Sequence, residues 1–209
     1  MWPWEHAIVG YLAYSLFSRL YYRESPTGLA AFAAVFASVL PDLIDKPLAW
    51  EFGVFQAGYA LGHSIFFAIP LAIVVGVLAR AAGRTPAGIA FGLGYLLHLP
   101  SDVLDGYLRG GHAYPELMLW PVETVSTNDH SQGFLEQFSR LFGQYQQDLL
   151  AGELSTYIWL QLGLAALAAL VWLADGAPVL RECFLGGKRF VVSRIPSNSR
   201  SERPSNQRK

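Results

Sequence analysis

The chain has 209 residues and a formal net charge of −1, with 53% hydrophobic and only 15% charged residues. Soluble proteins carry about 25% charged residues, so this composition and the mean hydropathy of +0.30 exclude an ordinary soluble domain and favour a membrane protein. Cys183 is the only cysteine, which excludes an internal disulfide and a thiolate metal cluster. We predict no nucleic-acid partner. We also expect no cleaved signal peptide, because a basic start with a short apolar core and a small-residue cleavage site is missing.

Five apolar segments of roughly membrane-spanning length follow one another along the chain. They cover about residues 3–22, 27–45, 58–80, 86–105 and 155–174. The second and fourth are rich in small residues, which suits close helix–helix packing in lipid. The predicted fold is therefore all-α, a polytopic membrane helix bundle with about five transmembrane helices.

Lysine and arginine residues sort to one side of this five-span arrangement. All but three of the 15 lie between the first and second segments, between the third and fourth, or after the fifth. The exceptions are Lys46, Arg109 and Arg140. Because basic residues are enriched in cytoplasmic loops, we predict a protein of the cell membrane with an extracytoplasmic N-terminus and a cytoplasmic C-terminus.

The long outer connection, about residues 106–154, contains an amphipathic pattern. One helical stripe is apolar and comprises Phe134, Leu135, Phe138, Leu141, Phe142, Tyr145 and Leu149. The other face is polar, with Gln137, Arg140, Gln144 and Asp148. Two interpretations stay open: a helix that lies on the outer leaflet or covers the bundle, or a helix of a small soluble cap. We assign residues 1–178 to one transmembrane domain and expect the polar, basic tail 179–209 to be disordered in the cytoplasm.

Imidazoles and carboxylates gather at the predicted outer ends of four segments. His98, Asp102 and Asp105 are spaced i, i+4 and i+7, which places all three on one face of a helix. Further such residues open or end the neighbouring segments, namely His6, Asp42, Asp45 and His63. Charged groups at membrane depth are costly and usually serve a function.

Three histidines and several carboxylates at one depth form a ligand set for one or two divalent metal ions. Zinc is favoured because it accepts nitrogen and oxygen ligands. The predicted ligands are His6, Asp42, His63, His98 and Asp102. Asp45 and Asp105 are the catalytic candidates, each left as a further ligand, a general base or a group that orients an imidazole. A single such residue is usually a cap or a hydrogen-bonded core residue, so the combination carries the prediction. We expect no role for His112 and His130, which lie in the loop.

At these residues the chain resembles the membrane-bound metal-dependent hydrolase family, also described as LexA-binding, inner-membrane-associated hydrolases. The resemblance covers residues 1 to about 125 and rests on His6, PDLID with Asp42 and Asp45, GHS with His63, GYLLHLPSD with His98 and Asp102, and LMLWPV at 117–122. The ligand order is also distantly similar to the zinc-dependent phospholipase C and single-strand nuclease group, although later His and Glu ligands of that group have no clear match. The resemblance implies hydrolysis without specifying a substrate.

The leading hypothesis is an enzyme, a membrane-embedded metal-dependent hydrolase that cleaves an ester or phosphoester at the extracytoplasmic face. The expected partners are membrane lipid and a lipid or phosphoester substrate, and the oligomeric state is left open. A metal-ion or proton transporter is one alternative, but the inner halves of the segments lack the ionisable residues of a conduction path. A non-enzymatic membrane scaffold is another, and it leaves the aligned histidines and aspartates unexplained.

Overall fold

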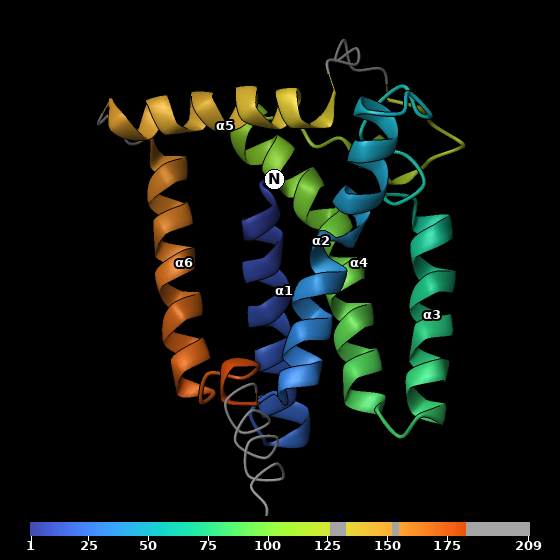
Figure 1. The fold of residues 1–209 in the computed structure, drawn as a ribbon, viewed down its shortest axis with the longest axis vertical. Coiled ribbons are helices and arrows are strands. Elements are labelled where there is room, and N and C mark those ends of the chain that lie inside the picture. The colour runs from blue at the N-terminus through green and yellow to red at the C-terminus, as the bar shows by residue number, and fades with distance from the viewer. Residues whose placement is uncertain (126–132, 152–154, 183–209) are drawn as a thin grey trace, which may run out of the picture.

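Five helices stand side by side and a sixth lies across one end of them, as Figure 1 shows. The structure is a computed structural model and describes residues 1–125, 133–151 and 155–182. Its α-helices are α1 (Pro3–Phe17), α2 (Gly28–Trp50), α3 (Ile65–Ala81), α4 (Thr85–Gly110), α5 (Phe134–Leu150) and α6 (Thr156–Ala174). A π-helical turn, η1 (Ser18–Tyr22), continues α1, and a short 3-10 helix, η2 (Pro115–Met118), follows α4. The all-α membrane bundle is confirmed, and the described residues contain no strand.

Local sequence signals decide where several helices begin and end. The side chain of Thr27 accepts a hydrogen bond from the backbone N–H of Ala30 at 3.3 Å and caps α2. Ser155 caps α6 in the same way, through the N–H of Ile158 at 3.3 Å. These side chains satisfy backbone donors that the first helical turn leaves unpaired. Gly111, with a φ of 72°, ends α4 in the left-handed conformation that glycine adopts without strain.

Small side chains let the central helices approach one another closely. Ala30 and Ala34 of α2 have no exposed surface and pack with Tyr14 of α1. A Cβ atom added at Gly94 of α4 would collide with the carbonyl oxygen of Ala34, so α2 and α4 touch backbone to backbone at this point. Helix association in lipid depends on such packing, because the lipid tails are as apolar as the side chains.

The close approach at Gly94 predicts a large effect on stability. Gly94→Ala should lower the free energy of unfolding by about 1–3 kcal/mol, since α4 must move away from α2 to admit the methyl group. Gly92→Ala on the same helix is the matched control, because its added Cβ would lie at an ordinary 3.8 Å from Ala72. Alanine's better helix propensity should leave that variant unchanged or slightly stabilised. Thermal unfolding in detergent micelles measures both, and equal midpoints would contradict the close contact.

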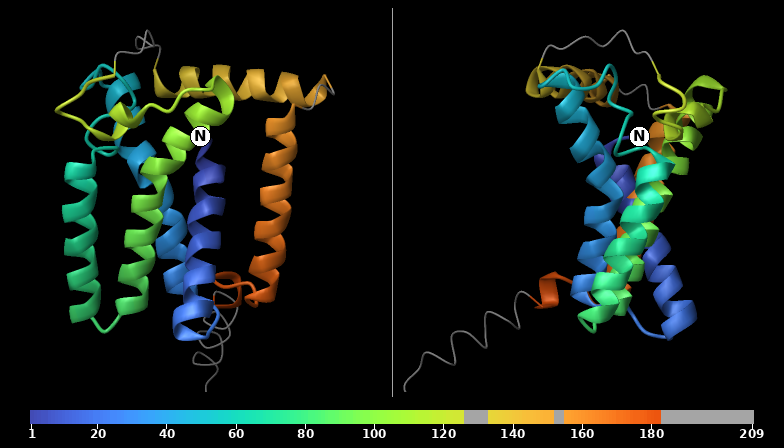
Figure 2. Two further views of the ribbon diagram at one scale, coloured as in Figure 1. Left: turned by 180° about the vertical axis from the view of Figure 1, so that it is seen from behind. Right: turned by 90° about the vertical axis from the view of Figure 1, so that its right-hand side faces the viewer.

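Three helices in the described residues have the length and apolar character of a membrane span. They are α2, α4 and α6, with 23, 26 and 19 residues. The expected count of about five is therefore too high by this measure, since α3 has 17 residues and α1 has 15. The shortfall arises at their ends: α1 passes into the π-helical turn at Ser18, and residues 58–64 form a connection instead of opening α3. All five upright helices still reach the end of the bundle opposite α5 (Figure 2).

Helix α5 covers the end of the bundle at which α1 begins and α2 ends (Figure 1). The rings of Phe142 and Tyr145 lie against Trp2, with centroids 6.4 Å and 5.3 Å away. Phe134 stacks on Trp50 at 5.9 Å. Aromatic pairs at these separations stabilise beyond the area that they bury. The helix therefore covers the bundle, as one of the two interpretations of the amphipathic pattern predicted.

Details of the outer connection differ from the expected pattern. It begins after Gly110 rather than at residue 106, because α4 continues further. Leu135 is 73% exposed although it was assigned to the apolar stripe, and Gln137 is 4% exposed although it was assigned to the polar face. Gln137 Oε1 accepts a hydrogen bond from Arg140 Nη2 at 2.9 Å, whereas Gln137 Nε2 is buried without a hydrogen bond to any described residue. His130 and residues 183–209 of the predicted tail lie outside the described residues.

Candidate metal centre

Four elements bring the predicted ligands to the end of the bundle that α5 covers. Helix α1 contributes His6, α2 contributes Asp42, and α4 contributes His98 and Asp102 one turn apart. His63 lies in the connection immediately before α3, not on the helix itself. All five side chains are buried, with no residue more than 5% exposed. The structure thus gathers every predicted metal ligand.

Four of these residues place one ligand atom each within 4.8 Å of all the others, and we call Asp42, His63, His98 and Asp102 the donor group. His63 Nε2 lies 3.0 Å from His98 Nε2, 3.4 Å from Asp42 Oδ1 and 3.3 Å from Asp102 Oδ2. His98 Nε2 lies 3.3 Å from Asp102 Oδ2 and 3.8 Å from Asp42 Oδ1. A tetrahedral zinc site with bonds of about 2.0–2.1 Å separates its ligand atoms by about 3.3 Å. The donor group could therefore hold a metal ion.

Unpaired polar atoms also indicate a cation at this place. Within the described part of the chain, Asp42 Oδ1, Asp102 Oδ2 and both ring nitrogens of His6 are buried without a hydrogen bond. Buried polar atoms are nearly always paired, because an unpaired one costs about 1–3 kcal/mol. A divalent ion among the carboxylates and imidazoles would remove that cost. The residues present therefore fit a metal.

His6 lies beside the donor group and shares Asp102 with it. The imidazole ring stacks on His98 with centroids 3.7 Å apart, and His6 Nε2 lies 3.1 Å from Asp102 Oδ1. Asp102 thus directs Oδ2 toward His63 and His98 and Oδ1 toward His6. A carboxylate arranged in this way can serve two neighbouring ions, but the N-terminal ammonium of Met1 lies 2.8 Å from the same Asp102 Oδ1. The geometry is compatible with one ion in the donor group, and a second ion beside His6 would have to displace this ammonium.

Two acceptors behind the histidines determine which ring nitrogens face the donor group. Asp45 Oδ2 lies 2.8 Å from His63 Nδ1, and the carbonyl oxygen of Ser38 lies 2.6 Å from His98 Nδ1. The Asp45 carboxylate also accepts three backbone N–H bonds of 2.7–3.0 Å, from Ala60, Gly62 and His63. Since these oxygens only accept, Nδ1 carries the proton in both rings and Nε2 is left to bind a metal. Of the roles left open for Asp45, this placement favours the orientation of His63.

Asp105 and His112 lie outside the donor group. Asp105 Oδ1 accepts hydrogen bonds from the Tyr157 hydroxyl at 2.8 Å and from Arg109 Nε at 3.0 Å. Tyr157 also bonds to Glu5 Oε1 at 2.5 Å, so this network links α1, α4 and α6. His112 is exposed and lies after the end of α4.

A cavity of about 420 Å³ adjoins the donor group, because Asp42 forms part of its wall. Its other polar wall residues include Lys46, Tyr59, Asp105 and Arg109, and its apolar ones include Trp2, Leu43, Trp50, Phe134, Phe138 and Leu141. Lys46 Nζ lies 2.7 Å from Asp42 Oδ2. Burial, reinforced by the carboxylates of Asp102 and Asp42, raises the pKa of the Tyr59 hydroxyl well above its usual value, so it stays a neutral donor. Neither Lys46 nor Arg109 was predicted as a site residue, although both belong to the three basic residues that the charge pattern left on this side.

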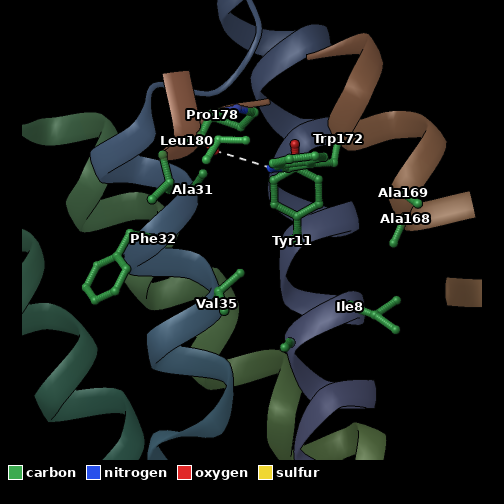
Figure 3. Close-up of a pocket in the computed structure, with 12 residues that line it drawn as sticks. Ile8, Tyr11, Ala31, Phe32, Val35, Ala168, Ala169, Trp172, Pro178 and Leu180 are labelled. Carbon is green, nitrogen blue, oxygen red and sulfur yellow. Dashed lines mark hydrogen bonds between the residues drawn. The ribbon is translucent and has the colours of Figure 1, made fainter. Parts of the chain in front are cut away.

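A second cavity, of about 580 Å³, carries no comparable chemistry. Figure 3 shows its wall, built by α1, α2, the last turns of α6 and the residues that follow. The side chains are almost all apolar, and Trp172 donates its indole N–H to the carbonyl oxygen of Pro178 at 3.3 Å. None of the predicted ligands borders this cavity. It provides an apolar surface without reactive groups.

Comparison with known proteins gives the chain a family. The sequence model of the YdjM inner membrane protein family matches residues 1–177, so the chain belongs to that family. Together with the apolar helices, this membership places the protein in a membrane. The match extends beyond the first 125 residues on which the resemblance rested and includes α5 and α6. Neither a curated protein nor a solved structure gives a significant match.

Proposed function

We propose that this member of the YdjM inner membrane protein family is a metal-dependent hydrolase that cleaves an ester or phosphoester at the extracytoplasmic face of the membrane. The observation that carries the proposal is the spacing of the four buried donors beside a cavity of ligand size. Two imidazole nitrogens and two carboxylate oxygens form a set that suits zinc. The cavity that Asp42 lines would admit water and substrate to one side of the donor group.

Asp42, His63, His98 and Asp102 would hold a divalent metal, which would supply Lewis acidity for activating water near neutral pH and polarising an ester or phosphoester oxygen. The residues of the chain would orient the ligands, add positive charge and accept a proton. His63 and His98 are held with Nε2 toward the donor group by the acceptors behind them. Lys46, beside Asp42, adds positive charge where a phosphoester gains negative charge. Asp105, on the wall of the same cavity, is the carboxylate placed to accept a proton.

The distribution of the basic residues supports the extracytoplasmic orientation that we propose. The α1–α2 and α3–α4 connections lie at the end of the bundle opposite α5 (Figure 1), and they contain Arg23 and Arg84. Single cysteines at the exposed positions Gln144 and Arg84, in a Cys183→Ser background, test this orientation. An impermeant thiol reagent applied to intact cells should label the first and not the second, because only α5 faces outward. Labelling of the Arg84 position without lysis would reverse the proposed orientation.

Hydrolysis itself is tested with purified protein in lipid nanodiscs. The panel contains phospholipids, lipid-linked pyrophosphates and simple phosphodiesters, each offered to zinc-replete protein. We expect turnover of at least one substrate, its loss with a chelator, and its return when zinc is restored. If nothing is cleaved, and zinc or proton transport into liposomes depends on His98 and Asp102, the protein is a transporter instead.

A further inference from the structure

Two cationic side chains line the cavity beneath α5, Lys46 from α2 and Arg109 from α4. Lys46 Nζ lies 2.7 Å from Asp42 Oδ2 and 6.0 Å above the ring of Trp50. Arg109 Nε lies 3.0 Å from Asp105 Oδ1. The side chain of Lys46 is only 16% exposed and that of Arg109 44% exposed. A lysine held away from water in this way usually has an anionic partner.

The charges of this wall do not balance once Asp42 serves a metal. Asp105 and Glu5, whose carboxylate lies 4.0 Å from Arg109 Nη2, then oppose three cations: Lys46, Arg109 and the N-terminal ammonium of Met1, which lies 3.1 Å from Asp105 Oδ2. One positive charge is left in excess beside the donor group. A phosphate or another compact anion would complete the balance, because cations bind such oxygens through short, charge-assisted hydrogen bonds. Arginine in addition offers a planar fork of donors that matches phosphate.

The remainder of the wall is suited to hydrocarbon. Helix α5 adds apolar side chains to the wall of the same cavity, from Phe134, Phe138 and Leu141. On the α2 side, Leu43 lines the cavity and is 53% exposed. In a membrane protein, such a residue marks a route along which an apolar chain can pass from the cavity into lipid.

We propose that this cavity binds a phosphate-bearing amphiphile, with the phosphate between Lys46 and Arg109 and the start of its hydrocarbon chain against Phe138 and Leu141. The chain leaves past Leu43 into the bilayer. A volume of about 420 Å³ accommodates the phosphate and the first part of a chain, the remainder being held by lipid. This inference rests on the proposed function, because it names the substrate class of the same site as a lipid-linked phosphoester.

Binding of dodecyl phosphate tests the inference without requiring turnover. The protein is placed in nanodiscs of zwitterionic lipid, with and without zinc, and binding is measured by calorimetry. Dodecyl phosphate should bind at least about 10-fold more tightly than dodecanol and than inorganic phosphate, since each lacks one half of the recognised structure. Lys46→Gln and Arg109→Gln should each weaken binding about 10-fold through loss of a charge-assisted hydrogen bond.

Matched variants separate recognition from damage to the fold. Arg84→Gln, exposed at the opposite end of the bundle, should bind as the wild type does, and Lys46→Arg should restore most of the affinity that Lys46→Gln loses. Phe138→Ala should weaken dodecyl phosphate but not inorganic phosphate. Phe66→Ala, on the exposed face of α3, is its control and should change neither.

The outcomes distinguish this inference from the proposed function. Wild-type affinity in both Lys46→Gln and Arg109→Gln would overturn it, as would equal binding of inorganic phosphate and dodecyl phosphate. If binding follows the expectation but no phosphoester is cleaved in any metal state, the cavity assignment stands and the hydrolase proposal fails. If the protein cleaves a soluble phosphodiester but does not bind the amphiphile, the hydrolase proposal stands and the cavity assignment fails.

Discussion

His98→Ala should remove most of the bound metal from the purified protein. The substitution deletes one of four buried donors, so a bound ion would lose a protein ligand and would have only water in its place. Since loss of an outer hydrogen-bond partner of a ligand already costs about 10–100-fold in metal affinity, loss of the ligand itself should cost at least about 100-fold. Elemental analysis after dialysis against a weak chelator gives the occupancy. The wild type should retain about one to two equivalents of zinc.

His112→Ala is the control for this measurement, because His112 is an exposed histidine of the same outer region that makes no contact with the donor group. Its metal content should equal that of the wild type. Added zinc should raise the thermal midpoint of the wild type and of His112→Ala, but not of His98→Ala, since only a bound ion stabilises the folded state. Unchanged metal content in His98→Ala would mean that the aligned histidines and aspartates serve structure alone.

Asp105→Asn and Asp45→Asn should separate catalysis from metal binding. Asp105 lines the cavity but lies outside the donor group, so Asp105→Asn should keep its zinc while turnover falls by about 10²–10⁴-fold through loss of the proton acceptor. Asp45 contacts His63 Nδ1, so Asp45→Asn should weaken zinc binding by about 10–100-fold. Its turnover should recover when zinc is supplied in excess.

Zinc titrations followed by rate measurements on both variants decide between these roles. Asp102→Asn serves as the reference for a ligand and should lose zinc and turnover together. If Asp105→Asn also loses its zinc, Asp105 is a ligand of a second ion near His6 rather than a base. If Asp45→Asn stays inactive in saturating zinc, then Asp45 acts in the reaction and not only through His63.

Few basic residues lie at this end of the bundle, which the enrichment of basic residues in cytoplasmic loops would explain. Lys46 and Arg109 both contact carboxylates and border the same cavity. A basic side chain in the exposed outer connection would be surrounded by water. Lys46 and Arg109 instead line the cavity in which we propose that a substrate anion binds. Lys46 and Arg109, which depart from the charge pattern, were therefore more informative than the basic residues that follow it. They were not predicted as site residues because no motif accompanies them.

The sequence by itself determined most of the helices and which residues gather at the candidate metal centre. Hydropathy and small residues predicted α2, α4 and α6 as spans, the spacing of apolar residues predicted α5, and the depth of His6, Asp42, His63, His98 and Asp102 predicted that they would meet. These features depend on periodicity within one segment or on distance along a helix axis, both of which can be counted along the chain.

Only the tertiary structure decided the roles within the site. Residues 58–64 were predicted to open a helix, but Asp45 of α2 captures three of the backbone amides there and holds His63 in a connection. Asp45 and Asp105 look alike in sequence, yet one lies behind a histidine and the other on a cavity wall. Their positions differ because each helix has its own rotation about its axis and its own shift along that axis relative to its neighbours. Backbone contacts such as that of Gly94 with Ala34 set both. Contacts between residues far apart in the chain leave no periodic signal, so they emerge only when the helices pack.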